Sequence, residues 1–228
     1  GMLDRLDGAF AKQRQFVSDA SHELRSPLTA MRGQIEVLAR NENPSAVEVR
    51  HMEAMAMAEM RRVERLLDDL LLLARLDEGV GPSLREVEAA PLLREIAAAV
   101  PDRQTEVGEL AAGVLTADPD QLAQVVRNLL SNAHRHASRV LLSSSAAGGE
   151  LTVSVDDDGT GIPPRERERV FDRFHRSEPS RDRSSGGSGL GLAIAHSIVA
   201  RHGGRIWVED SPLGGARVCF AIPGFRPG

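Results

Sequence analysis

The sequence predicts an α+β protein in two parts: a long antiparallel helical hairpin, then a domain in which helices back a largely antiparallel sheet. Three observations lead to this prediction. Apolar residues recur every seven positions through roughly the first 76 residues, the composition breaks at Gly79-Val80-Gly81-Pro82, and shorter segments with Gly-rich turns follow that break. We therefore expect a first domain at residues 1–78, a linker at 79–83 and a second domain at 84–228.

The first predicted helix covers about residues 3–40, because only one Pro and one Gly after Gly8 interrupt the pattern. Its apolar residues follow the spacing of a coiled-coil-like seam. One heptad position holds Phe10, Val17, Leu24, Met31 and Leu38, and Ala20, Leu28 and Ile35 fill intervening positions.

A second helix of similar length is predicted at about residues 46–76, after a polar break at 41–45 that contains Pro44 and Ser45. Two such helices joined by a short turn form an antiparallel hairpin, and a hairpin alone cannot cover both apolar seams. We therefore expect a homodimer that closes a four-helix bundle. The second seam holds Val49, Ala56, Val63 and Leu70 at one position and Met52, Leu66 and Leu73 at the other, with Glu59 as the exception.

Shorter elements are predicted beyond the linker, where helical and strand-like patterns alternate. A helix at 119–136 follows the start signal Asp118-Pro119, and two β-rich runs flank a Gly-Gly turn, which is typical of a hairpin. The pattern therefore favours a sheet backed by helices. The predicted strands are 84–87, 139–143, 150–156, 205–208 and 217–222, and the other helices are about 91–99 and 189–202.

Composition excludes several classes of function. Against 33 Asp and Glu stand 28 Lys and Arg, a net charge of −5, and the longest apolar runs, at 70–74 and 96–100, cannot span a bilayer. Lys12 is the only lysine, which excludes a P-loop, the strand lysine of protein kinases and Schiff-base chemistry. Cys219 alone cannot form an internal disulfide. We expect no nucleic-acid partner, because the Arg-rich stretch 165–183 holds seven Arg but also five acids.

His22 is the first candidate for chemistry. On a helix it lies about 140° from Val17 and about 160° from Leu24, so it points away from the seam. Glu23 can orient the imidazole or take its proton, which would leave one ring nitrogen as a nucleophile. Pro27 costs about 3 kcal/mol inside a helix and should bend it beside the histidine. The alternative is a surface histidine with no task.

Asn128 and Asn132 lie four residues apart, so both carboxamides share one helix face, which Arg135 and His136 extend. Amide oxygens are hard ligands suited to Mg²⁺, which takes few protein ligands beside water and phosphate oxygens. The alternative is a pair of Asn that only makes local polar contacts.

Asp157 begins a tight turn, Asp157-Asp158-Gly159-Thr160-Gly161-Ile162, directly after a predicted strand. A carboxylate at a strand end can accept a hydrogen bond from an exocyclic amine, and the glycines let backbone approach a flat ring. The competing interpretation, a calcium loop, fails because its first position would be Ser154 and its twelfth Arg165, where Glu is required.

A second glycine-rich segment, Gly187-Ser188-Gly189-Leu190-Gly191-Leu192, opens a predicted helix whose N-terminal N–H groups favour an anion. A dinucleotide-binding fingerprint is the alternative, and Glu209 has suitable spacing for it. That alternative fails because Leu192 stands where Gly or Ala is needed and no strand precedes the segment.

Fourteen consecutive residues around His22, Phe-Val-Ser-Asp-Ala-Ser-His-Glu-Leu-Arg-Ser-Pro-Leu-Thr, resemble the H-box of sensor histidine kinases of two-component systems. The resemblance implies that His22 is phosphorylated by ATP and that Glu23 is the general base. Four residues after the histidine, the family often has a Thr or Asn that helps water dephosphorylate the response regulator. Ser26 occupies that position here.

The other motifs resemble the remaining boxes of this family, in the family's order. Asn-Leu-Leu-Ser-Asn-Ala resembles the N-box, which implies Asn132 as the Mg²⁺ ligand with Asn128 as its neighbour. Arg135 replaces the usual Lys and can still meet phosphate, and His136 stands where an aromatic adenine contact is frequent. The resemblance further implies that the adenine-selecting G1 box consists of Asp157, Gly159, Gly161 and Ile162, and that Arg176 of the F-box lies at the γ-phosphate. It implies that the hinge of the ATP lid consists of Gly187, Gly189, Leu190, Gly191 and Leu192. The last glycine box is resembled by Gly214-Gly215-Ala216.

This resemblance covers nearly the whole chain. It implies a two-layer α/β sandwich of the Hsp90, gyrase and histidine kinase type, ATP and Mg²⁺ as cofactors, autophosphorylation of His22, and transfer to an aspartate of a response regulator. The opening residues 2–6 resemble the end of a helical relay, so we expect the cytoplasmic portion of a membrane sensor whose membrane part precedes this chain. The alternatives are a phosphatase-dominant kinase, a non-catalytic dimeric adaptor, and an ATPase that drives a clamp.

Overall fold

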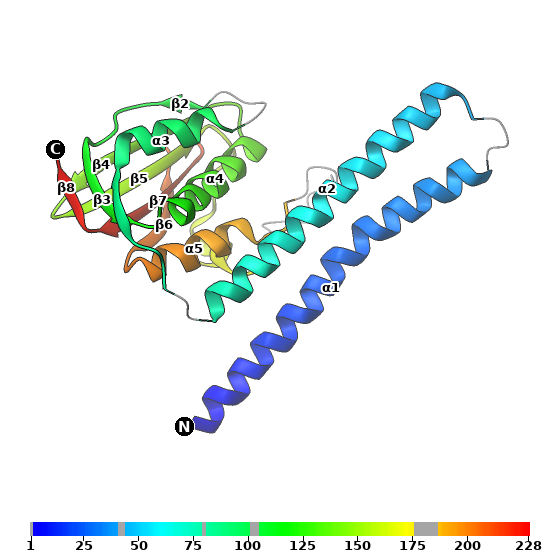
Figure 1. Cartoon of the computed structure of the whole chain (residues 1–228), viewed down its shortest axis with the longest axis horizontal. Helices are drawn as coiled ribbons and strands as arrows, with labels where there is room; N and C mark the ends of the chain where they lie inside the picture. Colours follow the sequence, from blue (N-terminus) through cyan, green and yellow to red (C-terminus); the bar gives the residue numbers. More distant parts are fainter. Residues whose placement is uncertain (1, 41–43, 79–80, 101–104, 176–186) are drawn as a thin grey trace. The chain divides into compact units, whose positions relative to one another are not determined.

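The computed structural model describes residues 2–40, 44–78, 81–100, 105–175 and 187–228, with side chains from residue 17 onward (Figure 1). The chain divides into two compact units, residues 1–72 and 73–228. The last residues of the second long helix therefore group with the second unit. Among the described residues, no helix combines the length and apolarity that crossing a membrane requires.

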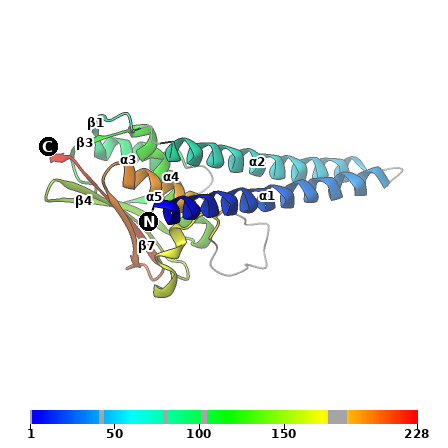
Figure 2. The same ribbon diagram turned by 90° about the horizontal axis from the view of Figure 1, so that it is seen from below.

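The first unit is a hairpin of two long helices, α1 (Met2–Arg40) and most of α2 (Ala46–Asp77), which run side by side in both views (Figures 1 and 2). A capping box starts α2, because the Ser45 N–H donates to Glu48 Oε2 at 2.8 Å and the Glu48 N–H donates to Ser45 Oγ at 3.3 Å. This confirms the predicted helix start. The hairpin turn was predicted at 41–45, of which 41–43 lie outside the described residues.

The predicted seams are only partly covered within one chain. Leu66 is 4% exposed, whereas Val17, Leu28 and Ile35 of α1 are 59%, 52% and 62% exposed. Isolated exposed hydrophobic residues are normal, but three at seam positions of one helix form an uncovered apolar face. The side chain of Phe10, the first residue of that seam, lies outside the described part.

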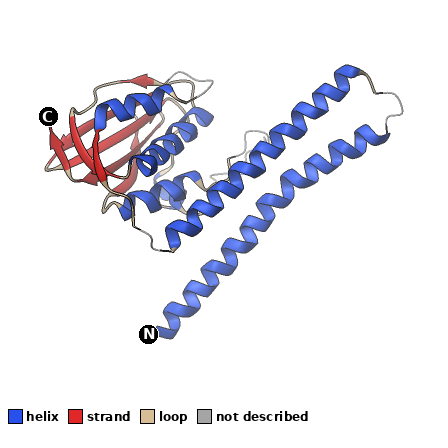
Figure 3. Ribbon diagram, in the orientation of Figure 1, coloured by secondary structure: helices blue, strands red, loops and turns tan. Residues whose placement is uncertain are grey.

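The second unit is a two-layer α/β sandwich, as predicted (Figure 3). Its main sheet has the strand order β2-β4-β5-β7-β6 and is antiparallel except for the β2–β4 pair, and a smaller antiparallel sheet has the order β1-β3-β8. The main sheet is formed by β2 (Glu106–Val107), β4 (Val140–Ala147), β5 (Glu150–Asp157), β6 (Arg205–Asp210) and β7 (Ala216–Pro223); the smaller sheet by β1 (Arg85–Glu88), β3 (Gly113–Ala117) and β8 (Phe225–Pro227).

Three helices form the second layer: α3 (Ala89–Ala98), α4 (Pro119–His136) and α5 (Gly191–Arg201), with the 3-10 turns η1 (Pro164–Glu166) and η2 (Arg169–Phe171) between β5 and α5. The side chains of alternate strand residues pack beneath these helices, because successive residues of a strand face opposite sides of the sheet. The core between the layers includes Leu122, Leu129, Val153, Ile194, Ile198 and Phe220, all at most 1% exposed.

Element predictions and structure agree closely where the local signals are strong. α4 has the predicted bounds, because Asp118 caps it and Pro119 stands in its first turn. The β4–β5 hairpin closes through Gly148 and Gly149, both at positive φ, which is the geometry of a two-residue hairpin turn. The short strands β2, β3 and β8 were not predicted.

Candidate functional site

His22 lies on α1 with its side chain exposed. The neighbouring Glu23 is partly buried, and its Oε2 lies 3.9 Å from Nη2 of Arg62 on α2. The other terminal nitrogen of Arg62, Nη1, lies 3.9 Å from Oε2 of Glu59, which is also on α2. Arg62 of the facing helix therefore forms a loose ion pair with Glu23, the residue that follows the histidine. α1 continues through Pro27, which is buried and has no N–H to donate to the Glu23 carbonyl.

The hydroxyls around His22 differ in what they bind. Ser21 Oγ and Thr29 Oγ1 donate to the carbonyls four residues earlier, Val17 and Arg25, at 2.7 and 2.8 Å. Ser26 is exposed, and its hydroxyl has no such bond within the described residues. Of these three hydroxyls, Ser26 is the one that the helix leaves open to water or to a partner.

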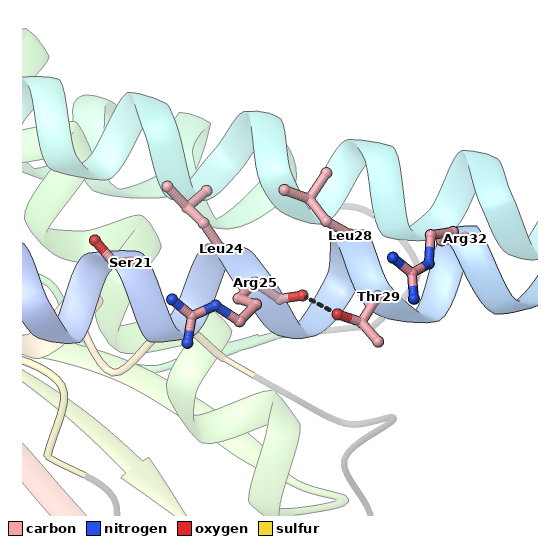
Figure 4. A pocket seen from close by; sticks show the side chains of 6 residues that line it. All are labelled: Ser21, Leu24, Arg25, Leu28, Thr29 and Arg32. Atoms are coloured by element: carbon pink, nitrogen blue, oxygen red, sulfur yellow. Dashed lines mark hydrogen bonds between the residues drawn. The ribbon is translucent and has the colours of Figure 1, made fainter.

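A shallow groove of about 360 Å³ runs along the same helix (Figure 4). Its walls come from α1 alone, with two leucines and two arginines among the lining side chains. The groove therefore combines apolar and positively charged side chains, and it begins at the residue before the exposed histidine. Ser21, Leu24, Arg25, Leu28, Thr29 and Arg32 line it.

In the second unit, Asn128 joins α4 to the start of α5. Its Nδ2 donates to the Gly191 carbonyl at 2.9 Å, and its Oδ1 accepts from Gln124 Nε2 at 3.1 Å. Asn132, one turn further on, is partly buried, and its carboxamide has no hydrogen bond within the described residues. The two asparagines of the predicted pair therefore differ: Asn128 is tied into the fold, and Asn132 is available to a ligand.

Arg135 and His136 end α4. The Arg135 guanidinium lies against Gly187, where an added Cβ would be 2.4 Å from Arg135 Nη1. Partial burial lowers the pKa of His136, the adjacent Arg135 charge lowers it further, and Asp157 opposes these effects. The structure thus brings the end of α4 to the segment that precedes α5 and to the end of β5.

Asp157 is 5% exposed at the end of β5. Its Oδ1 accepts from the N–H groups of Gly159 at 2.9 Å and of Ala216 at 3.0 Å. These bonds fix the carboxylate and leave Oδ2 without a hydrogen bond to any described residue. A carboxylate oxygen with a free lone pair is suited to accept from a ligand amine.

The last glycine segment completes this corner. Gly215 packs so closely that an added Cβ would lie 2.2 Å from Asp157 Oδ1, and the Gly215 N–H donates to the Asp157 carbonyl at 3.1 Å. Arg167 Nε donates to the Ile162 carbonyl at 3.1 Å and so holds the turn that follows Gly161. Sequence spacing did not indicate the contribution of Arg167.

The second glycine-rich segment leads into α5 as predicted. Gly189 lies against the backbone of Phe174, with its carbonyl accepting from the Phe174 N–H at 3.0 Å, and an added Cβ would be 2.9 Å from Phe174 Cα. Phe174 itself has a backbone φ of +60°, in the left-handed region that residues with a side chain rarely adopt. Leu190 is fully buried and Leu192 partly buried, so these two anchor the start of the helix.

The predicted residues Asn128, Asn132, Arg135, His136, Asp157 and the glycines thus gather at one end of α4, β5 and α5. Arg176 lies outside the described residues. Gln124 was missed by sequence reasoning, although its spacing of four residues from Asn128 could have indicated the contact.

A magnesium ion fits the donor set of this corner. Nowhere in the described residues do three or more His, Cys, Asp or Glu side chains form a metal-binding group, so a metal here would need amide and phosphate oxygens. Mg²⁺ accepts such a set, because it keeps several waters and binds few protein ligands beside substrate phosphates. The carboxamide of Asn132, which has no hydrogen bond within the described residues, could supply the protein oxygen of such a set.

Comparison with known proteins gives two family matches. Residues 12–79 match the His Kinase A (phospho-acceptor) domain, and residues 117–225 match the histidine kinase-, DNA gyrase B-, and HSP90-like ATPase domain. The first match contains His22 and the second contains the whole corner built by α4, β5 and α5. Each domain family thus coincides with one of the two sites.

Individual relatives agree with these matches. The sensor protein RstB of Escherichia coli strain K12 is 38% identical over 97% of this chain and 51% of RstB. Among solved structures, the mycobacterial sensor histidine kinase MprB is 30% identical, covering 64% of this chain and 99% of the other at a TM-score of 0.55. Full-length ShkA in complex with AMPPNP is 28% identical, covering 94% and 46% at a TM-score of 0.67.

The chain spans about half the length of the curated relatives it matches. The fold, the two domain matches and the identity to MprB over almost all of that structure agree with one another. This chain therefore belongs to the sensor histidine kinases of two-component systems.

Proposed function

We propose that this chain catalyses ATP-dependent autophosphorylation of His22 and passes the phosphoryl group to an aspartate of a response regulator. The observation that carries the proposal is the presence of two complementary sites in one chain. An exposed histidine with a carboxylate beside it lies in a phospho-acceptor domain, and a corner with free amide and carboxylate oxygens lies in an ATPase-type domain.

ATP is held by groups that suit each of its parts. Asp157 Oδ2 accepts from the adenine amine, His136 lies near the base, and Arg135 meets phosphate as a fork. The N–H groups at the start of α5, with the helix dipole, stabilise the negative phosphates, and Arg176 contributes at the γ-phosphate. Gly159, Gly161 and Ile162 line the adenine side, and Gly187, Gly189, Leu190, Gly191 and Leu192 form the hinge of the lid.

Asn132 is the proposed magnesium ligand, with Asn128 beside it. Bound Mg²⁺ would neutralise phosphate charge during transfer. The support is the unbonded carboxamide of Asn132, whereas Asn128 acts mainly by holding α4 against Gly191.

At His22, the imidazole loses a ring proton to Glu23 while the other ring nitrogen attacks the γ-phosphorus. The bond between the γ-phosphorus and its bridging oxygen breaks, and ADP leaves with the electron pair. Arg62 orients Glu23 through their 3.9 Å contact. The phosphohistidine then loses its phosphoryl group to the aspartate carboxylate of the regulator.

The hairpin would work as a homodimer, with a second copy covering the apolar face of α1 that contains Val17, Leu28 and Ile35. The groove next to His22 supports docking of a receiver domain, because Arg25 and Arg32 complement the acidic pocket that surrounds a phosphorylatable aspartate. We assign residues 1–78 to dimerisation and phosphotransfer, 79–83 to the linker and 84–228 to catalysis. We also propose that the chain is the cytoplasmic portion of a membrane sensor, since the curated relatives are named sensor proteins and the chain spans about half of their length.

Phosphatase activity toward the regulator is the second candidate, because the Ser26 hydroxyl is exposed and unused by the helix. A hydroxyl at this place can orient a water toward a phosphoaspartate. A purely structural adaptor would not need a free Asp157 oxygen and a free Asn132 carboxamide at one corner.

The test is incubation with γ-labelled ATP and Mg²⁺, for the wild-type chain, His22→Gln and Asp157→Asn. We expect acid-labile, base-stable label on the wild type and none on His22→Gln, while His22→Gln still binds ATP. Label persisting on His22→Gln would refute the assignment of the phosphoacceptor. Loss of phosphate from a phosphorylated regulator, compared between wild type and Ser26→Ala, tests the second candidate.

A further inference from the structure

The two helices that carry the proposed ATP site are tied together at two points. Asn128 Nδ2 donates to the Gly191 carbonyl at 2.9 Å near the site, and the Asp118 N–H donates to His202 Nε2 at 3.1 Å at the opposite end. Since α4 starts at Pro119 and α5 ends at Arg201, the helices run antiparallel between these ties. The second tie lies about 15 Å along α4 from the first, at 1.5 Å per residue.

Both ring nitrogens of His202 form hydrogen bonds with backbone groups. It is 8% exposed, its Nε2 accepts from a backbone N–H, and its Nδ1 lies 2.9 Å from the Ile198 carbonyl. A carbonyl can only accept and a backbone N–H can only donate, so Nδ1 carries the proton and the ring is the neutral tautomer. Both ring nitrogens are therefore committed to backbone, one within α5 and one across to α4.

Asp118 extends this tie to the linker. Its Oδ1 accepts from the N–H groups of Asp120 and Gln121 as the cap of α4, and its Oδ2 accepts from the Ser83 N–H at 2.9 Å. Ser83 is the last residue of the proposed linker. One residue thus connects the linker exit, the start of α4 and, through His202, the end of α5.

We propose that Ser83, Asp118 and His202, here called the linker junction, set the position of α4 against α5 and so couple the linker to the ATP site. Asp118 and His202 act as positioning residues. Without the second tie, α4 pivots about the Asn128–Gly191 bond, and Asn132 lies one turn beyond that pivot. The proposal rests on the proposed function, because it takes Asn132 and the start of α5 as nucleotide-binding groups.

Two substitutions of His202 separate its two bonds. The Gln side chain can place its amide oxygen as far from the backbone as Nε2 of histidine, so His202→Gln can still accept a hydrogen bond from the Asp118 N–H. The Asn side chain can place its amide nitrogen as far from the backbone as Nδ1 of histidine, so His202→Asn keeps the hydrogen bond to the Ile198 carbonyl and loses the bond to α4. Both remove the ring, and Gln keeps one methylene group more than Asn.

The first experiment measures binding of a fluorescent ATP analogue to the full 228-residue chain, well below the unfolding temperature. We expect His202→Asn to raise Kd about three- to tenfold, the range that loss of one buried hydrogen bond supplies, and His202→Gln to stay within about twofold of wild type. A folded His202→Asn with wild-type Kd would overturn the proposal. So would equal weakening by both variants, because that pattern indicates loss of packing alone.

The second experiment tests the linker arm with Ser83→Pro. Ser83 is the centre of a three-residue turn in which the Leu84 N–H donates to the Pro82 carbonyl at 3.1 Å. Among the described residues other than glycine, only Phe174 has a positive φ, so Ser83 has the negative φ of an inverse γ-turn, which Pro accepts. Ser83→Pro therefore removes the N–H and places the ring Cδ against Asp118 Oδ2, so the carboxylate must move away from the linker, and Ser83→Ala keeps the N–H as the control.

We expect Ser83→Pro to raise Kd for the analogue in wild type and to have no further effect when His202 is already Asn, because both act through Asp118. Additive effects, or no effect of Ser83→Pro alone, would refute the coupling. Hydrogen exchange of the first turn of α4 gives a readout that needs no nucleotide. If the wild type fails to bind the analogue, the proposed function fails, whereas faster exchange in His202→Asn than in His202→Gln still supports the junction and equal exchange refutes it.

Discussion

Replacing Gly215 by Ala tests whether the orientation of the Asp157 carboxylate decides nucleotide binding. An added Cβ would lie 2.2 Å from Asp157 Oδ1 and 2.4 Å from the Gly159 nitrogen, so the carboxylate or the surrounding backbone must move. The bonds at risk are those from Gly159 and Ala216 to Oδ1. Hydrogen bonds to a charged group contribute about 1.5–3 kcal/mol each, so losing both costs about 3–6 kcal/mol.

Only part of this cost falls on binding, because some of it destabilises the unbound chain. Half of the smaller figure, about 1.5 kcal/mol, already corresponds to a tenfold rise in Kd. We therefore expect Gly215→Ala to bind ATP at least about tenfold more weakly than the wild type. The assay is titration with a fluorescent ATP analogue, with thermal unfolding measured on the same samples.

Gly214→Ala is the matched control in the same turn. A Cβ at Gly214 meets nothing within 4 Å, but its φ is +103, which disfavours any residue with a side chain. We expect a loss of about 1 kcal/mol in the free energy of unfolding with ATP affinity retained. If Gly215→Ala is folded and binds the analogue as tightly as Gly214→Ala does, the reasoning about Asp157 is refuted.

Three further outcomes follow from buried and shifted groups. The Asp156 carboxylate is 0% exposed and pairs with Arg217 at 2.7 and 3.1 Å, so Arg217→Met leaves a buried charge without its cation. We expect urea unfolding to show a loss of about 3–5 kcal/mol in the free energy of unfolding, and a loss below about 1 kcal/mol would contradict this. Burial raises the pKa of Cys219 to about 12, so its thiol should resist a disulfide reagent at pH 8 in the folded chain and react once the chain is unfolded. The lowered pKa of His136 means that folding favours its neutral form. Its contribution to stability is therefore present above the ordinary pKa of 6.5 and declines as the pH falls through that region. The NMR titration midpoint of His136 should lie below 6.5 and fall further in Asp157→Asn, and a midpoint above 6.5 would contradict the burial argument.

How far the sequence predicts this fold depends on how local the signals are. The bounds of α4 follow from Asp118, Pro119 and a helical apolar period, all within one segment. The helix predicted from residue 91 begins at Ala89 instead, with Glu88 as a cap that makes no side-chain hydrogen bond, so no start signal marked it. The strands β3 and β8 were not predicted, because β8 has only three residues and β3 pairs with it across more than a hundred positions of sequence.

The candidate site divides in the same way. The shared face of Asn128 and Asn132 follows from a spacing of four residues, but their different bonding follows from Gln124 and Gly191, of which the latter is 63 residues away. The junction of Asp118 with His202 joins residues 84 apart, and no periodicity links them. Tertiary hydrogen bonds of this kind decide which member of a motif is free for a ligand, and a single sequence does not encode them in any local pattern.

The two oxygens of Asp157 differ in bonding, and under the proposed function this difference decides which base is selected. Backbone N–H groups hold Oδ1, so an Asn at this position would keep its amide oxygen there and present its NH₂ group to the ligand. The ligand side would then change from an acceptor to a donor. Asp157→Asn should therefore do more than weaken ATP: it should favour a purine nucleotide with a 6-keto oxygen, such as inosine triphosphate. Base preference at this corner would thus reverse through one atom, while the hydrogen bonds that hold the turn stay in place.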